Sequence, residues 1–136
     1  MDNSIKNGLV KYRLEQAKTT LHTAEKLFSD EDKDFVSVIN RAYYAIFYAI
    51  RAVLFLEEKD FKRHKDVIAY FNKNYVNTEV FPKKLGRKIA QAQYCREKSD
   101  YDGEYTVKEE KVKEQLETAK EVVELIEKYL NENLNK

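Results

Sequence analysis

One stretch of the chain constrains its fold more than any other, the segment from Phe35 to Leu56. Only four of its 22 residues are not hydrophobic: Ser37, Asn40, Arg41 and Arg51. A helix that is apolar almost all round must be surrounded on every side. Arg41 and Arg51 leave nine uninterrupted apolar residues between them, whereas a membrane span needs roughly 20. The segment therefore predicts the central helix of a protein bundle and no membrane anchor.

The remaining segments predict an all-α fold. Apolar residues recur at helical spacing over residues 5–28, 63–75 and 82–96. The last helix has an unbroken pattern of steps of four and three, formed by Val112, Leu116, Ala119, Val123, Ile126 and Leu130. Three glycines and one proline suit helices better than strand-rich folds. We expect an antiparallel up-and-down bundle of four or five helices, forming a single domain over residues 1–136 with an ordered core of about 5–130.

Local signals give the expected boundaries. Residues 74–81 and 99–105 are predicted to be loops, because polar residues gather in them, Pro82 follows the first and Gly103 lies in the second. Thr106 and Glu109 have the spacing of a capping box, which would start the last helix at that point. The tail from Asn131 to Lys136 is expected to fray.

Composition narrows the chemistry. Cys95 is the single cysteine, and with only two histidines the chain offers poor material for a disulfide or a structural zinc site. We find no phosphate-cradling glycine loop, expect no metal and no cofactor, and expect a buried or partly buried thiol at Cys95 and a surface position for His22. The first residues lack the apolar stretch of a signal peptide, so a cytoplasmic protein is the expectation.

Charge is distributed unevenly along the chain. Residues 59–98 carry 11 basic and 4 acidic side chains, a net of +7, whereas residues 99–136 carry 6 basic and 11 acidic ones, a net of −5. A basic middle suggests an anionic partner such as RNA or a nucleotide. The alternatives are that the last helix simply presents a solvated acidic face, or that the two regions neutralise each other within the fold.

Two groups of residues are candidates for binding an anion. The first is a polar stripe along the central helix, formed at steps of four and three by Ser37, Arg41, Tyr44, Tyr48 and Arg51. Its arginines must pair with carboxylates, reach water or face an anionic ligand. The second group opens the third helix with Lys62, Arg63, His64 and Lys65 and continues on the fourth helix with Lys83, Lys84, Arg87 and Lys88. Capping and solubility are the alternative role for the residues that open the third helix.

The stretch from Asn40 to Ala49, NRAYYAIFYA, resembles the central helix of HEPN-domain proteins. His64 after that helix, Phe71 at the end of the next apolar face, and the segment 96–101 before a long last helix are similar to the same family. The resemblance covers residues 9–130. It implies an antiparallel helical bundle that forms a homodimer, and it implies a minimal nucleotidyltransferase as partner.

The resemblance also implies a catalytic arginine that is separated from a histidine by four to six residues. Arg96 matches the arginine, but positions 101–103 are Tyr, Asp and Gly. The leading hypothesis is therefore a non-catalytic or weakly catalytic HEPN protein that binds RNA or nucleotide. An active ribonuclease toxin using Arg96, Tyr101 and His64 is the second hypothesis, and a structural dimerisation module is the third. By the same resemblance, Tyr101 and Tyr105 are candidate sites of nucleotidylation by the partner.

Overall fold

The computed structural model describes residues 1–101 and 106–134, with the side chain of Tyr101 left out. It confirms the all-α prediction. Five α-helices span the described residues: α1 (Asn3–Ser29), α2 (Phe35–Leu54), α3 (His64–Phe71), α4 (Lys84–Tyr101) and α5 (Glu109–Asn133). A short 3-10 turn, η1 (Phe55–Glu57), extends α2, and a π-helical turn, η2 (Asn72–Val76), extends α3.

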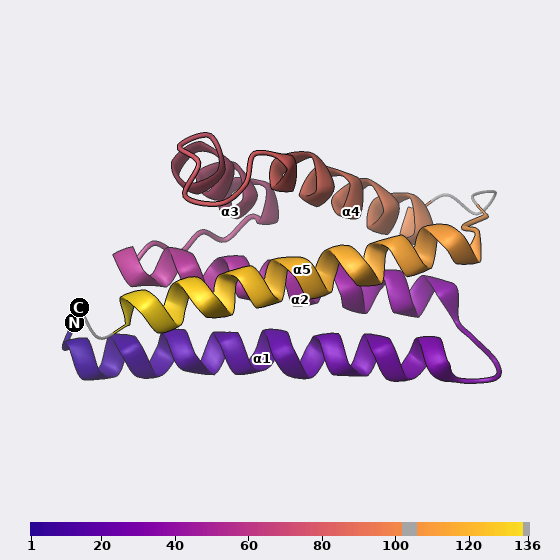
Figure 1. Cartoon of the computed structure of the whole chain (residues 1–136), viewed down its shortest axis with the longest axis horizontal. Coiled ribbons are helices and arrows are strands. Elements are labelled where there is room, and N and C mark those ends of the chain that lie inside the picture. Colours follow the sequence, from indigo (N-terminus) through magenta and orange to yellow (C-terminus); the bar gives the residue numbers. More distant parts are fainter. Residues whose placement is uncertain (102–105, 135–136) are drawn as a thin grey trace.

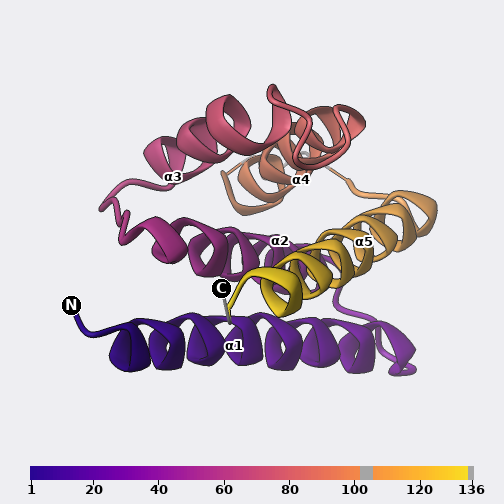
Figure 2. The ribbon, with the colours of Figure 1, turned by 60° about the vertical axis from the view of Figure 1, so that its left-hand side comes forward.

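The helices form an up-and-down bundle. α1 and α2 run antiparallel along the length of the molecule, and α5 returns beside α2 in the same direction (Figure 1). α3 and α4 lie over α2 and α5 on the side away from α1, as a second view also shows (Figure 2). The side-chain amide of Asn7 donates to the carbonyl of Leu134 over 2.9 Å, so the beginning of α1 and the end of α5 meet.

Helix α2 is the centre of the bundle, as its sequence predicts. Twelve of its residues are buried, and α1, α4 and α5 all pack against it. The segment Phe35–Glu57 is long and apolar enough to cross a membrane, but 72% of its apolar window is buried inside the protein. Its apolar character is therefore accounted for by packing in the core of a helical domain.

Aspartates begin the first two helices. The side chain of Asp2 accepts a hydrogen bond from the backbone N–H of Ser4 over 2.6 Å, and that of Asp34 accepts one from the N–H of Ser37 over 3.2 Å. Each satisfies a backbone donor that has no partner within the helix.

The predicted loop at residues 99–105 is wrong in its first part. Helix α4 continues through Ser99 and Asp100 to Tyr101. The Asp100 carboxylate lies one turn after Arg96 and meets its Nε at 3.5 Å, which favours the helical conformation over a loop. Residues 102–105 lie outside the described part of the chain.

The predicted capping box at Thr106 is also wrong. Helix α5 begins at Glu109, and Lys108 stands at the N-cap without a side-chain hydrogen bond to the helix. The Glu109 carboxylate instead pairs with Lys33 at 3.3 Å, at the end of the connection between α1 and α2. Glu109 is thus the first residue of α5, whereas a capping box requires the glutamate three residues after the N-cap.

Two further boundaries differ from the prediction. Residues 72–76 form a π-helical turn where a loop was expected from Asn74, because the aromatic ring of Tyr75 stacks on Phe71 and packs on Phe81. The C-terminal tail does not fray at Asn131: α5 runs to Asn133, and Leu134 is buried. Tertiary burial of a single leucine has extended the last helix.

Candidate functional site

Arg96 projects from α4 onto the aromatic side chains of α2. Its guanidinium carbon lies 5.2 Å from the ring centroid of Tyr43 and 5.4 Å from that of Tyr44. Nη2 of Arg96 donates to the hydroxyl of Tyr44 over 3.4 Å, and Nε faces the Asp100 carboxylate. Only 17% of the side chain is exposed. Stacking, a hydrogen bond and an ion pair therefore fix the position of this arginine.

His64 reaches the same two tyrosines from the start of α3. Its ring centroid lies 4.1 Å from that of Phe47 and 5.7 Å from that of Tyr44, and its Nδ1 is 3.5 Å from the hydroxyl of Tyr43. Burial lowers the pKa of His64 below its ordinary value, and the positive charges of Arg96 and Arg51 lower it further. His64 therefore carries a neutral imidazole at neutral pH.

Tyr43 is the buried link between Arg96 and His64. It is 1% exposed, and burial raises the pKa of its phenol to about 12, although the charge of Arg96 acts in the opposite direction. The phenol therefore remains protonated at neutral pH. Arg96, Tyr43, Tyr44, Phe47 and His64 together form what we call the Arg96–His64 cluster.

The stripe on α2 lies partly within this cluster. Arg41 places its guanidinium carbon 5.2 Å from the ring of Tyr44 and donates to the side-chain oxygen of Asn40 through Nη2 at 2.7 Å. Arg51 pairs with Asp60 at 3.3 Å. The alternative of carboxylate pairing thus holds for Arg51, whereas Arg41 is stabilised by an amide oxygen and an aromatic ring.

The basic residues of α4 do not join the cluster. Lys84 and Lys88 both turn to α5, where they pair with Glu121 at 3.7 and 3.0 Å. At these two positions the ion pairs agree with the alternative in which the basic middle and the acidic last helix neutralise each other. Lys83 and Arg87 are exposed and have no ion-pair partner among the described residues.

The basic residues that open α3 also separate. Arg63 pairs with Asp66 within the first turn at 3.3 Å, in agreement with a local stabilising role. Lys62 lines a pocket beside His64. His64 alone among the residues of this group contacts the aromatic rings of α2.

The remaining candidates add little to the site. Tyr101 is the last residue of α4, its side chain lies outside the described residues, and Tyr105 lies outside them altogether. Cys95 is buried and His22 is exposed, as expected. Within residues 1–101 and 106–134, no group of three or more His, Cys, Asp or Glu side chains is placed to hold a metal ion.

Known proteins are similar in sequence to this chain over most of its length. The sequence model of the HEPN domain matches residues 10–129. The chain belongs to the HEPN family. A UPF0332 protein of Thermotoga maritima is 31% identical to it over 93% of this chain and 95% of its own length. Two proteins of Methanocaldococcus jannaschii are also similar. "Putative toxin MJ0142" is 30% identical over 86% of this chain and 78% of its own length. "Putative toxin MJ0605" is 34% identical over 71% of this chain and 71% of its own length.

Sequence reasoning missed part of the site of this HEPN domain. Tyr43 and Phe47 were assigned only to the apolar body of α2, yet they carry the contacts that bring His64 and Arg96 together. Asp60 was not singled out, and Asp100 was noted only as part of the segment 96–101, although each holds one of the candidate arginines. The spacing from Arg96 to Asp100 was the available signal, since residues four apart meet on a helix.

Proposed function

We propose that this HEPN domain binds single-stranded RNA or a nucleotide through the Arg96–His64 cluster and has little or no ribonuclease activity of its own. We further propose that it acts in a pair with a minimal nucleotidyltransferase. The observation that carries the binding proposal is the placement of Arg96 and Arg41 against Tyr44. Two guanidinium groups beside a half-buried ring offer both charge for a phosphate and a surface for a base.

Weak cleavage follows from the missing histidine after Arg96. Cleavage of RNA without a metal needs a general base near neutral pKa to accept the proton of the 2′-hydroxyl. The three positions at the expected distance from Arg96 hold Tyr, Asp and Gly. A tyrosine with an ordinary pKa of about 10 is a poor base at pH 7.

The binding test is a titration of a fluorescently labelled single-stranded RNA followed by anisotropy. We expect affinity to fall steeply between 50 and 200 mM salt, because phosphate contacts release counterions. Arg96→Ala should weaken binding about tenfold or more, whereas Lys128→Ala, which removes an exposed charge on α5, should change it less than twofold. Binding that is absent, or indifferent to both salt and Arg96, would contradict the proposal.

The pairing proposal rests on family membership and has its own test. Co-expression with a small nucleotidyltransferase encoded beside this chain should give a stable complex on size-exclusion chromatography. Incubation with that enzyme and a nucleoside triphosphate should add a nucleotidyl mass to the chain, removed by Tyr101→Phe or Tyr105→Phe. Failure of both experiments would leave an RNA-binding domain without this partner.

An active ribonuclease toxin is the second candidate function. It is favoured by the contact of His64 and Arg96 with the same two tyrosines, because His64 could then supply the base that the sequence window lacks. Two relatives carry names that begin with "Putative toxin". Degradation of RNA by the purified protein, abolished by Arg96→Ala and by His64→Ala, would favour this candidate over the first.

A further inference from the structure

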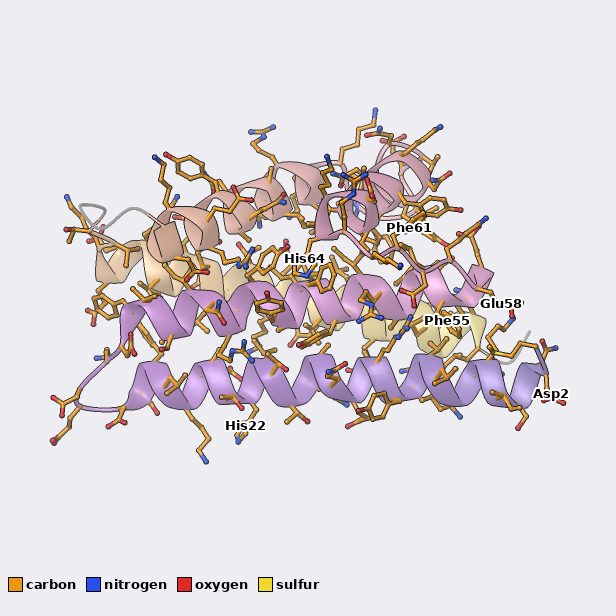
Figure 3. All side chains as sticks on the ribbon, turned by 180° about the vertical axis from the view of Figure 1, so that it is seen from behind. Asp2, His22, Phe55, Glu58, Phe61 and His64 are labelled. Carbon is orange, nitrogen blue, oxygen red and sulfur yellow. The ribbon has the colours of Figure 1, made fainter. Side chains whose placement is uncertain are left out.

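A pocket of about 490 Å³ opens beside the Arg96–His64 cluster, between α2 and the segment that leads into α3. Phe47 and Arg51 of α2 form one wall, and Asp60, Phe61, Lys62 and His64 form the other. His64 and Phe61 both lie above α2 in a view from behind (Figure 3). The pocket thus continues the cluster along α2 toward its C-terminal end.

The pocket offers aromatic rings together with positive charge. Phe61 is half-buried, packs on Tyr70 with ring centroids 5.5 Å apart, and forms part of the lining. The ring of His64 lies against Phe47 on the opposite side. Flat rings exposed in a concave, cationic setting bind unpaired bases by stacking, with little dependence on sequence.

Arg51 supplies the charge and keeps donors for a ligand. Its Nη2 meets Asp60 at 3.3 Å, while 29% of its side chain is exposed and forms part of the pocket lining. Lys62 stands nearby, exposed and without an ion pair among the described residues, so that two cations face the opening.

Asp60 lowers the positive charge of the pocket lining and holds Arg51 in position. Its Oδ2 accepts from Nη2 of Arg13 over 3.1 Å and its Oδ1 from Nη2 of Arg51 over 3.3 Å, so it bridges α1 and α2. Because the aspartate neutralises one charge, the lining keeps a net positive charge from Arg51 and Lys62. This suits a phosphodiester with one negative charge.

We propose that this pocket is a subsite for one nucleotide of single-stranded RNA, with the base stacked on Phe61 and the adjacent phosphate held by Arg51 and Lys62. The inference rests on the proposed RNA binding and names where one base would be held. A base in a duplex is paired and stacked, so the subsite selects unpaired nucleotides.

The chain contains no tryptophan, which allows a direct test. Phe61→Trp places a fluorophore in the pocket, and His22→Trp places one on the exposed edge of α1 away from α3 as the matched control (Figure 3). The probes are a short single-stranded oligouridylate, an oligoadenylate, and ribose 5-phosphate, which has a phosphate but no base. Circular dichroism of each variant checks that it folds.

We expect both oligonucleotides to quench the emission of the Phe61→Trp variant saturably and to leave that of His22→Trp unchanged. Ribose 5-phosphate should bind at least tenfold more weakly and quench little, because it lacks the ring that stacks. Adding Arg51→Gln to Phe61→Trp should weaken the oligonucleotide titration at least fivefold. In the otherwise unchanged chain, Phe61→Ala should weaken RNA binding about fivefold or more.

The outcomes separate the subsite from RNA binding itself. RNA binding that depends on Arg96 but leaves both tryptophan variants unquenched would overturn the subsite and leave the proposed function standing. Equal effects of ribose 5-phosphate and oligonucleotide would overturn the base-stacking part and reduce the pocket to an anion site. If Phe61→Trp does not fold, unchanged RNA affinity in Phe61→Ala and Arg51→Gln would overturn the inference. An absence of all RNA binding would overturn both proposals.

Discussion

His64 combines an aromatic contact with a titratable group in a setting that disfavours its charge. Burial is the main cause of its lowered pKa, and Arg96 and Arg51 add electrostatic repulsion of the imidazolium. A phosphate bound between these cations would reduce that repulsion. The same side chain is therefore neutral in the empty site and easier to protonate beside an anion.

The lowered pKa of His64 predicts a pH dependence of stability. In the unfolded chain the imidazole regains its ordinary pKa of about 6.5 and takes up a proton more readily than in the folded protein. The free energy of unfolding should therefore lose a contribution as the pH falls below about 6.5. Urea unfolding at pH 7.5 and pH 5.5 should show a smaller acid loss in His64→Phe than in the wild type.

A matched variant separates the effect of His64 from that of the other histidine. His22→Gln removes the other imidazole, which is exposed and outside the cluster, and should retain the wild-type difference between the two pH values. Equal acid losses in the His64→Phe variant and the wild type would show that His64 is not held neutral by the fold.

Glu57 gives a second prediction at the scale of single residues. One carboxylate oxygen accepts from the hydroxyl of Tyr70 over 3.1 Å, and the other accepts from that of Tyr75, which is 6% exposed. Glu57→Ala should lower the free energy of unfolding by about 1–3 kcal/mol, because it leaves the Tyr75 hydroxyl buried without a partner. Chemical denaturation measures this directly.

A double variant tests the cause of that loss. Tyr75→Phe removes the hydroxyl itself, so Glu57→Ala combined with Tyr75→Phe should cost clearly less than the sum of the two single changes. Additive losses would show that Glu57 stabilises the fold through something other than this hydrogen bond.

At the scale of elements, long apolar periodicities predicted the helices better than capping and loop residues predicted where the helices begin and end. The apolar face of α5 and the nearly all-apolar α2 were predicted correctly, because burial of a whole face outweighs any single residue. The capping box at Thr106 failed because α5 begins only at Glu109, which pairs with Lys33, a partner far away in sequence. Similarly, nothing near Tyr75 in sequence reveals that Phe81 and Tyr129 surround it.

The candidate site was predictable only in part for the same reason. Arg96 and His64 were singled out from sequence, but their shared contact with Tyr43 and Tyr44 depends on how α3 and α4 pack on α2. The pairing of Lys84 and Lys88 with Glu121 was foreseen only as a general neutralisation. The packing of the helices decides which charged side chains pair, and the spacing of residues in the sequence does not predict that packing.

The inside and outside faces of the helices give a stability prediction at this scale. Ile46 is 1% exposed, so Ile46→Asp should prevent folding by burying a carboxylate without a partner. Glu121→Ala should cost no more than about 1 kcal/mol, since its ion pairs with Lys84 and Lys88 are partly exposed. Glu124→Ala, one turn further on and exposed, is the matched control and should be silent. Circular dichroism and urea denaturation would measure all three, and a loss in Glu121→Ala comparable with that in Ile46→Asp would contradict the assignment of faces.

At the scale of the whole molecule, the bundle covers most but not all of α2. The helices around it bury twelve of its residues. From Arg41 to the end of α2, the residues that remain half-exposed are those of the stripe, Arg41, Tyr44, Tyr48 and Arg51. These aromatic and arginine side chains lie beside the Arg96–His64 cluster and the pocket at Phe61. A second subunit placed on this face would line the candidate site from the opposite side.

We therefore predict a homodimer that uses the α2 stripe. Closed two-fold dimers are the commonest oligomers, and tyrosine and arginine are enriched at interfaces. Tyr48→Asp should give a folded monomer, because Tyr48 is only half-buried within one chain, whereas Tyr94→Asp, on the exposed side of α4, should remain dimeric. Sedimentation at tens of micromolar protein is the measurement, because at that concentration an interface of more than about 7 kcal/mol stays associated. A wild-type protein that sediments as a monomer would contradict the dimer, and a dimer unaffected by Tyr48→Asp would place the interface elsewhere.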